Sequence, residues 1–418
     1  MQLLNRAYIK IYLLVLLLYV FFNKGVAYSY MAELLLVAGI LILFINRNSF
    51  EIGLDRKQIL VGIFILVSFL FIVVGLFQYT ILNVLRDSLA FQYAWFTFIM
   101  YFLKNEYNFI WQKILQIYKW APLVIFLNFF LFYFVFLYLP PINIFGNQNI
   151  IIYKNGDKSV HLLISTILMF LYTEKYSRKL LIANTILIVI NFLILLAFTR
   201  SGSVAYILAL FSFFFFSKEK IVNESIIKLL KFVPIIMVIG IGLFIAIDIQ
   251  GDAQGRTVSL SQITDNFTSI VSSDIDGTLT DNKVWRLIWW AKIVNESFTL
   301  QHFFVGKGLG MSLAGNDILN TDDNLRSPHN FHLTILARFG YFVFITWIIW
   351  LVSLFKPLFT RKLAGKTLAI TSILLAFIIN GSFDVFFEGP MGAFPFWTFV
   401  GLLFIENSYG SPTEIPNS

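Results

Sequence analysis

The residues best suited to chemistry lie in the segment RSPHNFHLTILARFG, which runs from 326 to 340. Ser327 is a typical N-cap and Pro328 a typical first helical residue, so the spacing predicts a helix with His329 in its first turn. The positive end of that helix would attract an anion and disfavour the imidazolium, so a neutral His329 could accept a proton beside a bound phosphate. The alternative is a histidine that only caps the helix or hydrogen-bonds at an interface.

Two more residues of this segment are candidates for substrate binding. His332 lies three residues after His329 on the same helical face, a spacing that could also suit a metal. No carboxylate or third histidine stands at ligand spacing, so no metal is expected. Arg338 would lie about 14 Å along the helix, and an ionisable group at that depth in a membrane is a functional candidate by default.

Arginines also stand beside polar residues elsewhere in the chain. Arg86 precedes Asp87, Arg200 lies in the sequence TRSGS at the start of an apolar run, and Arg326 opens the segment above. A guanidinium fork suits a diphosphate, and Arg200 at a helix start would add backbone N–H donors to its charge. The alternative for Arg86 and Arg200 is that they only reach lipid phosphates at the membrane surface.

The stretch DNKVWRLIWWAKIV, from 281 to 294, predicts an amphipathic helix at the membrane surface. Asp281 or Asn282 would cap it, and its apolar face comprises Val284, Leu287, Ile288 and Ala291. Arg286 and Trp290 lie together on another side, an arrangement that suits a lipid diphosphate or a sugar ring. A plain interfacial anchor would show the same pattern.

Two carboxylates stand in the sequence FDVFFEGP, near the end of the chain. Asp384 and Glu388 could orient a base or bind sugar hydroxyls. The interpretation we favour is that they are solvated or salt-bridged.

The composition calls for lipid around these elements. Of 418 residues, 58% are hydrophobic and only 13% are charged, against about 25% charged in soluble proteins. The apolar runs are continuous, so the spans must be helices that satisfy their own backbone groups. The basic residues are spread between the runs and form no patch for nucleic acid, and the absence of cysteine excludes disulfides and thiolate chemistry.

The apolar runs predict an all-α integral membrane protein of about twelve transmembrane helices. They lie near 7–22, 29–45, 59–77, 88–103, 120–139, 160–173, 180–198, 201–216, 232–249, 330–355, 363–380 and 391–405. Most of the lysines and arginines between them fall on one side, which predicts that both termini are cytoplasmic. The candidate arginines and His329 then fall at the opposite, outer face.

This topology divides the chain into four parts. Residues 1–249 would form spans one to nine, 250–328 an extracytoplasmic subdomain, 329–405 the last three spans and 406–418 a cytoplasmic tail. A loop as long as 250–328 is usually functional or disordered, and the tryptophans of the amphipathic stretch favour order.

The arrangement resembles the O-antigen ligase and O-antigen polymerase superfamily of bacterial membrane glycosyltransferases. The resemblance rests on TRSGSVAYILAL, on VWRLIWWAKIV followed by VGKGLG, and above all on RSPHNFHLTILARFG. It covers about residues 180 to 350 by motif and the rest by architecture. It implies a GT-C-like helical protein of the bacterial inner membrane whose active site faces the periplasm.

The resemblance also implies a reaction and its residues. The reaction is an inverting, metal-independent and cofactor-free transfer of a glycan from an undecaprenyl-diphosphate-linked oligosaccharide to an acceptor hydroxyl. Carried over, Arg200 and Arg286 bind the diphosphate and His329 is the base. Arg86, Arg326, His332, Arg338 and Trp290 are further candidates for substrate binding.

The acceptor stays open between an O-antigen or exopolysaccharide polymerase, which uses another lipid-linked glycan, and an O-antigen ligase, which uses the lipid A core of lipopolysaccharide. RSPHNFHLTILARFG together with FDVFFEGP resembles members of the polymerase type, so the resemblance favours the polymerase. A transporter of lipid-linked sugars would also need outward arginines, but transporters usually show internal repeats and several ionisable residues at mid-membrane. The expected partners are the glycan substrates and membrane lipids, without nucleic acid.

Overall fold

The computed structural model describes residues 2–46, 55–140, 142–143, 150, 152–217, 249–250, 257–258, 278–313, 326–360 and 363–410. This part of the chain is helical apart from turns and one short antiparallel pair, β1 (Ile249–Gln250) with β2 (Thr257–Val258). The predicted all-α architecture is confirmed for these residues.

The helices follow one another in the order that the apolar runs predict. They are α1 (Gln2–Phe22), η1 (Asn23–Ser29), α2 (Met31–Ile45), α3 (Arg56–Leu76), α4 (Ile81–Gln92), α5 (Trp95–Phe102), η3 (Leu103–Glu106), α6 (Tyr107–Phe134), η4 (Phe136–Tyr138), α7 (Asn155–Leu171), η5 (Thr173–Lys175), α8 (Arg178–Phe198), α9 (Arg200–Phe215), α13 (Thr278–Ser297), α14 (Leu300–Val305), α15 (Phe331–Thr360), α16 (Gly365–Gly381), η6 (Val385–Glu388) and α17 (Pro390–Gly410).

Five helical segments of the described chain are long and apolar enough to cross a membrane. They are Leu3–Ser29, Arg56–Leu76, Trp95–Phe134, Arg178–Phe198 and Phe331–Thr360. Three shorter helices, α2, α9 and α16, are also apolar. A helix satisfies its own backbone hydrogen bonds, which an apolar solvent requires.

Two predicted segments differ from the helices observed. The run 88–103 is divided between α4 and α5, and the run 120–139 belongs to a helix that already begins at Tyr107. The first turns of α6 carry Gln112, Lys113 and Gln116, which mask their apolar face in a hydropathy reading. The predicted span 232–249 lies almost entirely outside the described residues.

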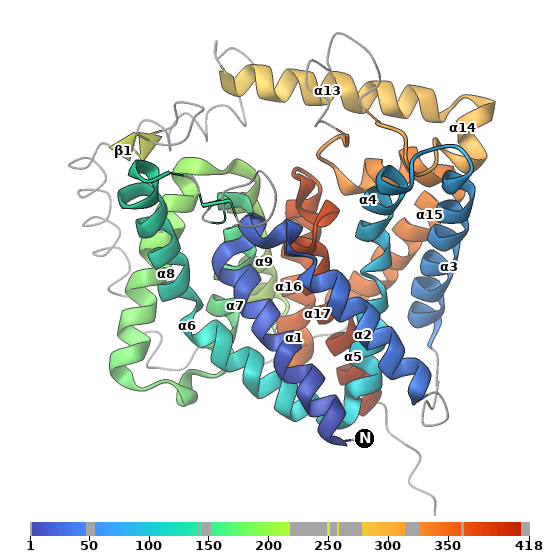
Figure 1. The fold of residues 1–418 in the computed structure, drawn as a ribbon. Helices are drawn as coiled ribbons and strands as arrows, with labels where there is room; N and C mark the ends of the chain where they lie inside the picture. Colours follow the sequence, from blue (N-terminus) through green and yellow to red (C-terminus); the bar gives the residue numbers. More distant parts are fainter. Residues whose placement is uncertain are drawn as a thin grey trace, which may run out of the picture.

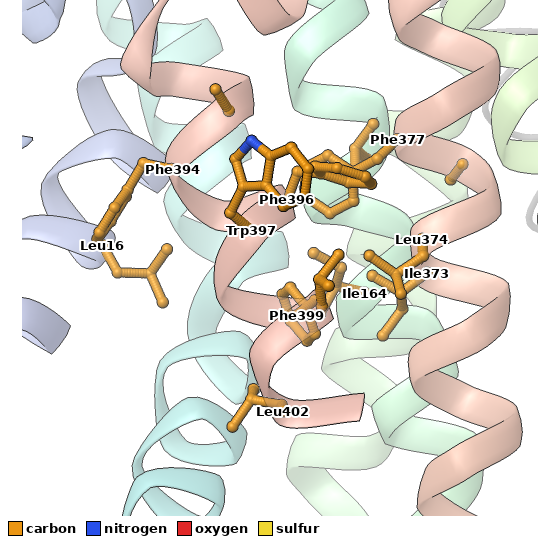
Figure 2. Packing of buried hydrophobic residues seen from close by; sticks show 14 of the residues in the cluster. Leu16, Ile164, Ile373, Leu374, Phe377, Phe394, Phe396, Trp397, Phe399 and Leu402 are labelled. Carbon is orange, nitrogen blue, oxygen red and sulfur yellow. The ribbon is translucent and has the colours of Figure 1, made fainter. Parts of the chain in front are cut away.

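The core lies where α17 meets α5, α16 and α1 (Figure 1). Figure 2 shows Phe396 and Phe399 of α17 beside Phe377 of α16, with ring centroids 5.9 and 6.2 Å from it. Phe394 faces Leu16 of α1 in the same view. Aromatic side chains bury large apolar areas, so this contact fixes the centre of the bundle.

One end of the bundle carries the residues of interest, and we call it the site end. The first turns of α7 and α9 pack together there, α15 begins at the same end, and α13 lies across it (Figure 1). The N-terminus of the chain lies at the opposite end (Figure 1). The last turn of α1 also reaches the site end, where its carbonyl groups need donors.

The buried Lys158 of α7 supplies these donors. Its ammonium donates to the carbonyl of Val20 at 2.9 Å and to that of Phe21. A cation at the C-terminus of a helix interacts favourably with the helix dipole. Lys158 therefore ties α1 to α7 at the site end.

We expect Lys158→Ala to destabilise the protein by about 2 kcal/mol, because the carbonyls at the end of α1 lose a charged donor. Thermal unfolding of the detergent-solubilised protein would measure this loss. The control is Lys356→Ala, which removes an exposed lysine of α15 and should leave the midpoint unchanged. Equal midpoints for the two variants would contradict the role of Lys158.

Candidate functional site

His329 lies in a turn before α15 and not inside the helix. Its backbone is left-handed, with φ at 55°, and α15 begins two residues later at Phe331. Asn330 is the cap, since its side-chain oxygen accepts from the backbone N–H of Leu333 at 3.1 Å. The prediction that Ser327 caps the helix and Pro328 begins it was therefore wrong.

A contact with another helix explains this shift of the helix start. The carbonyl of Pro328 accepts a hydrogen bond from the indole of Trp290 at 2.7 Å, which holds this residue outside the helix. Asn330 caps a helix as well as serine does, so the capping group moves three residues along the chain. His329 still stands next to the positive end of α15.

The environment of His329 keeps its imidazole neutral. Burial, and then the Arg286 guanidinium, lower the pKa of His329 to about 4, although Asp384 acts in the opposite direction. The Trp285 ring meets the imidazole edge to face at 5.6 Å. His329 Nδ1 is buried and has no hydrogen-bond partner among the described residues, so it can accept a proton.

Helix α13 covers this turn and supplies Arg286. The Arg286 Nη1 donates to the carbonyl of Phe383 at 3.0 Å, and the guanidinium carbon lies 5.6 Å from the centre of the Trp285 ring. Trp290 lies beside Phe383 as well, with ring centroids 6.4 Å apart. Arg286 and Trp290 thus share a neighbour, the loop between α16 and η6.

Helix α13 does not pack on the rest of the protein with the apolar face that the sequence predicts. Trp289 and Ile293 are buried, and the Trp289 indole donates to the carbonyl of Leu313 at 3.0 Å. Val284 and Leu287, both on the predicted apolar face, are 45% and 50% exposed. The tryptophans therefore hold α13 on the site end, a role that the periodicity alone did not reveal.

Lys154, just before α7, lies between two carboxylates. Its ammonium is 3.1 Å from Asp384 Oδ1 and 3.3 Å from Asp157 Oδ1. Burial opposes its charge, yet the two aspartates raise the pKa of Lys154 above its ordinary value. Burial would likewise raise the pKa of Asp384, but Lys154 outweighs burial and holds it below the ordinary value. Lys154 and Asp384 are therefore both charged at neutral pH.

The start of α9 lies near Asp384, on the other side of Gly156. A side chain at Gly156 would put its Cβ 3.0 Å from Asp384 Oδ2 and 3.8 Å from Thr199 Oγ1, so these two groups lie close together. Thr199 caps α9 by accepting from the backbone N–H of Gly202 at 3.2 Å. Arg200 is the next residue and the first of α9.

The structure thus brings the start of α9 beside the loop that carries Asp384, and it places Arg286 and Asp384 within electrostatic reach of His329. Sequence reasoning missed Lys154 and Asp157 as parts of this cluster. Their signal is the sequence KNGDKS ahead of an apolar run, which has the pattern of an ordinary charged loop between two spans. We call Lys154, Asp157, Asp384, Arg286 and His329 the site cluster.

Arg326 and Arg338 lie elsewhere, on either side of the Asp87 carboxylate. Arg326 Nη2 and Arg338 Nη2 are each 2.9 Å from Asp87 Oδ2. Arg326 also donates to the carbonyl of Gly310 and Arg338 to that of Gly308, at 2.8 and 3.1 Å. These guanidinium groups are occupied by the protein, so they clamp α4 and the loop after α14 to α15. Neither is placed as the sequence expected of a substrate-binding residue.

Arg86 and His332 stay predictions as substrate-binding residues. Arg86 is exposed on α4, within electrostatic reach of Arg326 and Asp87. His332 uses both ring nitrogens: Nδ1 accepts from the Trp347 indole at 2.9 Å, so Nε2 carries the proton and faces Ser382 Oγ at 3.0 Å. These contacts hold the His332 ring between α15 and the end of α16.

Comparison with models of protein families gives no match, and no curated protein matches the sequence. The chemistry of the site cluster therefore has to be argued from its own residues.

We expect Asp87→Ala to destabilise the protein by about 3–5 kcal/mol, because it leaves the buried Arg338 guanidinium without its partner. Chemical denaturation in detergent would measure the loss. The matched control is Glu106→Ala, which removes the partner of the exposed Arg6 and should cost less than about 1 kcal/mol. A similar cost for both variants would contradict the clamp.

Proposed function

We propose that the chain is a membrane glycosyltransferase of the O-antigen polymerase and ligase type, which its motifs resemble. It transfers a glycan from an undecaprenyl-diphosphate carrier to a sugar hydroxyl. One observation carries the proposal: a neutral His329, whose Nδ1 has no hydrogen-bond partner among the described residues, lies within electrostatic reach of Arg286 and Asp384 at one end of an apolar helical bundle. Asp384 in turn lies near the start of α9.

His329 would act as the base. Its pKa of about 4 leaves the imidazole neutral at neutral pH, and with the remaining proton on Nε2 the Nδ1 atom is the acceptor. As the acceptor oxygen attacks the anomeric carbon, the hydroxyl proton passes to Nδ1 and the bond to the diphosphate breaks on the opposite face, which inverts the configuration. Asp384, which interacts favourably with the protonated ring, stabilises the imidazolium that forms.

Arg200 and Arg286 would bind the leaving diphosphate. Arg200 stands at the N-terminus of α9, where the helix dipole adds to its charge. Arg286 is oriented by the Phe383 carbonyl and the Trp285 ring, and a guanidinium held in this way needs little reorganisation as charge develops. In this proposal these fixed cations neutralise the departing diphosphate without a metal or other cofactor.

The proposal also sets the location. The site end would face the periplasm of a bacterial inner membrane, with both termini cytoplasmic, and the shorter helices would complete about twelve spans. The sequence supports this orientation, because most lysines and arginines between the apolar runs fall in the segments predicted to be cytoplasmic. The site lies at the membrane surface, where a lipid-linked donor presents its diphosphate.

We favour a polymerase, with another lipid-linked glycan as acceptor, over a ligase that uses the lipid A core. Purified protein in detergent with EDTA, given a synthetic undecaprenyl-diphosphate oligosaccharide, tests this choice. A ladder from the donor alone supports the polymerase, and a product that needs added lipid A core makes it a ligase. Donor binding without transfer under either condition contradicts the enzyme and favours a transporter.

The same assay tests the residues. We expect His329→Ala to lower the transfer rate by about 10²–10⁴-fold and Arg200→Ala or Arg286→Ala by about 10²–10³-fold. The control is His302→Ala, which removes a histidine of α14 outside the site cluster and should transfer like the wild type. Full transfer by a folded His329→Ala variant would remove the base assignment.

A further inference from the structure

Glu388 lies beneath the turn that carries His329, although it is not part of the site cluster. It is the last residue of η6, and its side chain is largely shielded from solvent. Its Oε1 lies 3.5 Å from the Thr334 hydroxyl, which also donates to the Asn330 carbonyl at 3.0 Å, and the Ser327 side chain lies close enough to lower the pKa of Glu388 by hydrogen bonding. These two hydroxyls stand on either side of the turn, one before His329 and one in the first turn of α15.

The turn needs such support because its backbone is strained. A left-handed conformation is uncommon for a residue other than glycine, and it persists only where the surroundings impose it. Trp290 holds the turn from α13 through the Pro328 carbonyl, and Asp87 holds it from α4 through Arg326. Glu388 holds it from the third side, that of η6.

Glu388 changes its charge near neutral pH. Burial raises its pKa to about 7, and the carboxylates of Asp384 and Asp87 act in the same direction, against Ser327 and the guanidinium of Arg338. An ionised carboxylate only accepts hydrogen bonds, so it can serve both hydroxyls, whereas a protonated one gives up part of that capacity. His329, whose pKa is about 4, stays neutral throughout this range.

We propose that Glu388 is a positioning residue: as a carboxylate it accepts from Ser327 and Thr334 and holds the turn that presents His329. The consequence for catalysis rests on the proposed function. It is that the transfer rate falls as the pH is lowered through about 7, at a pH where the base itself is still neutral.

The first test needs no activity. Hydrogen exchange followed by mass spectrometry at pH 8 would compare the peptide covering 326–334 in the wild type, Glu388→Ala, Glu388→Gln and a control, Glu296→Gln. Glu296 pairs with Lys307 at the same end of the molecule, outside the turn. We expect Glu388→Ala to speed exchange of the Leu333 and Thr334 amides by about tenfold, and Glu388→Gln, which keeps an acceptor oxygen, by less than about threefold.

The second test is the pH profile of glycan transfer. The wild type and Glu296→Gln should lose activity below about pH 7, and Glu388→Gln should lose clearly less, because glutamine does not titrate whereas Asp157, whose burial raises its pKa to about 7, still does. A loss in Glu388→Gln as large as in the wild type would overturn the positioning role in catalysis. Unchanged exchange in Glu388→Ala would overturn the structural role.

The two tests separate this inference from the proposed function. Faster exchange in Glu388→Ala supports the contact with the turn even if the wild type transfers no glycan, a result that would count against the enzyme alone. Transfer that depends on His329, together with exchange that ignores Glu388, would keep the enzyme and remove the positioning residue.

Discussion

A charge inside an apolar bundle must have a partner, and the site end of this protein is organised by that requirement. Lys154 lies between Asp157 and Asp384, and this ion pair connects the start of α7 to the loop between α16 and η6. Removing either charge would leave the other in a medium that solvates it poorly. The pair therefore fixes where Asp384 stands, and Asp384 in turn lies within electrostatic reach of His329.

A second buried ion-pair cluster has Asp87 between Arg326 and Arg338. It connects α4 to α15 and to the segment before it. Arg326 stands three residues before the strained backbone of His329, so this ion pair helps to hold the turn, and His329 Nδ1 has no hydrogen-bond partner among the described residues. Preorganised groups of this kind cost little reorganisation when charge develops, which is what the proposed glycan transfer requires. Where a guanidinium is bound by the protein itself, as with Arg326, its charge serves the fold.

Much of the fold could be predicted from the sequence because hydropathy and helix periodicity are local properties. Most of the described apolar runs coincide with a helix, although the run 88–103 is divided between two, and the amphipathic stretch around Trp289 is a helix. Two helix starts were wrong. Helix α13 already begins at Thr278, so neither Asp281 nor Asn282 caps it. For α15, Ser327 and Asn330 are both good caps, and only the Trp290 contact with Pro328 decides between them. The clamping role of Arg338 was not predictable, because its partner Asp87 lies far away in the chain.

By itself the sequence indicated that lipid surrounds the protein, that the fold is helical and which residues are able to do chemistry. These properties depend on composition and on spacing within one element. Only the tertiary structure decided which of those residues meet. It brought Arg286, Asp384 and His329 together and added Lys154 to the site. It also placed His332 where its ring hydrogen-bonds to Trp347 and Ser382. The physical reason is that burial and ion pairing are set by neighbours from other helices, and these determine whether a polar group is spent on the fold or left available for a substrate.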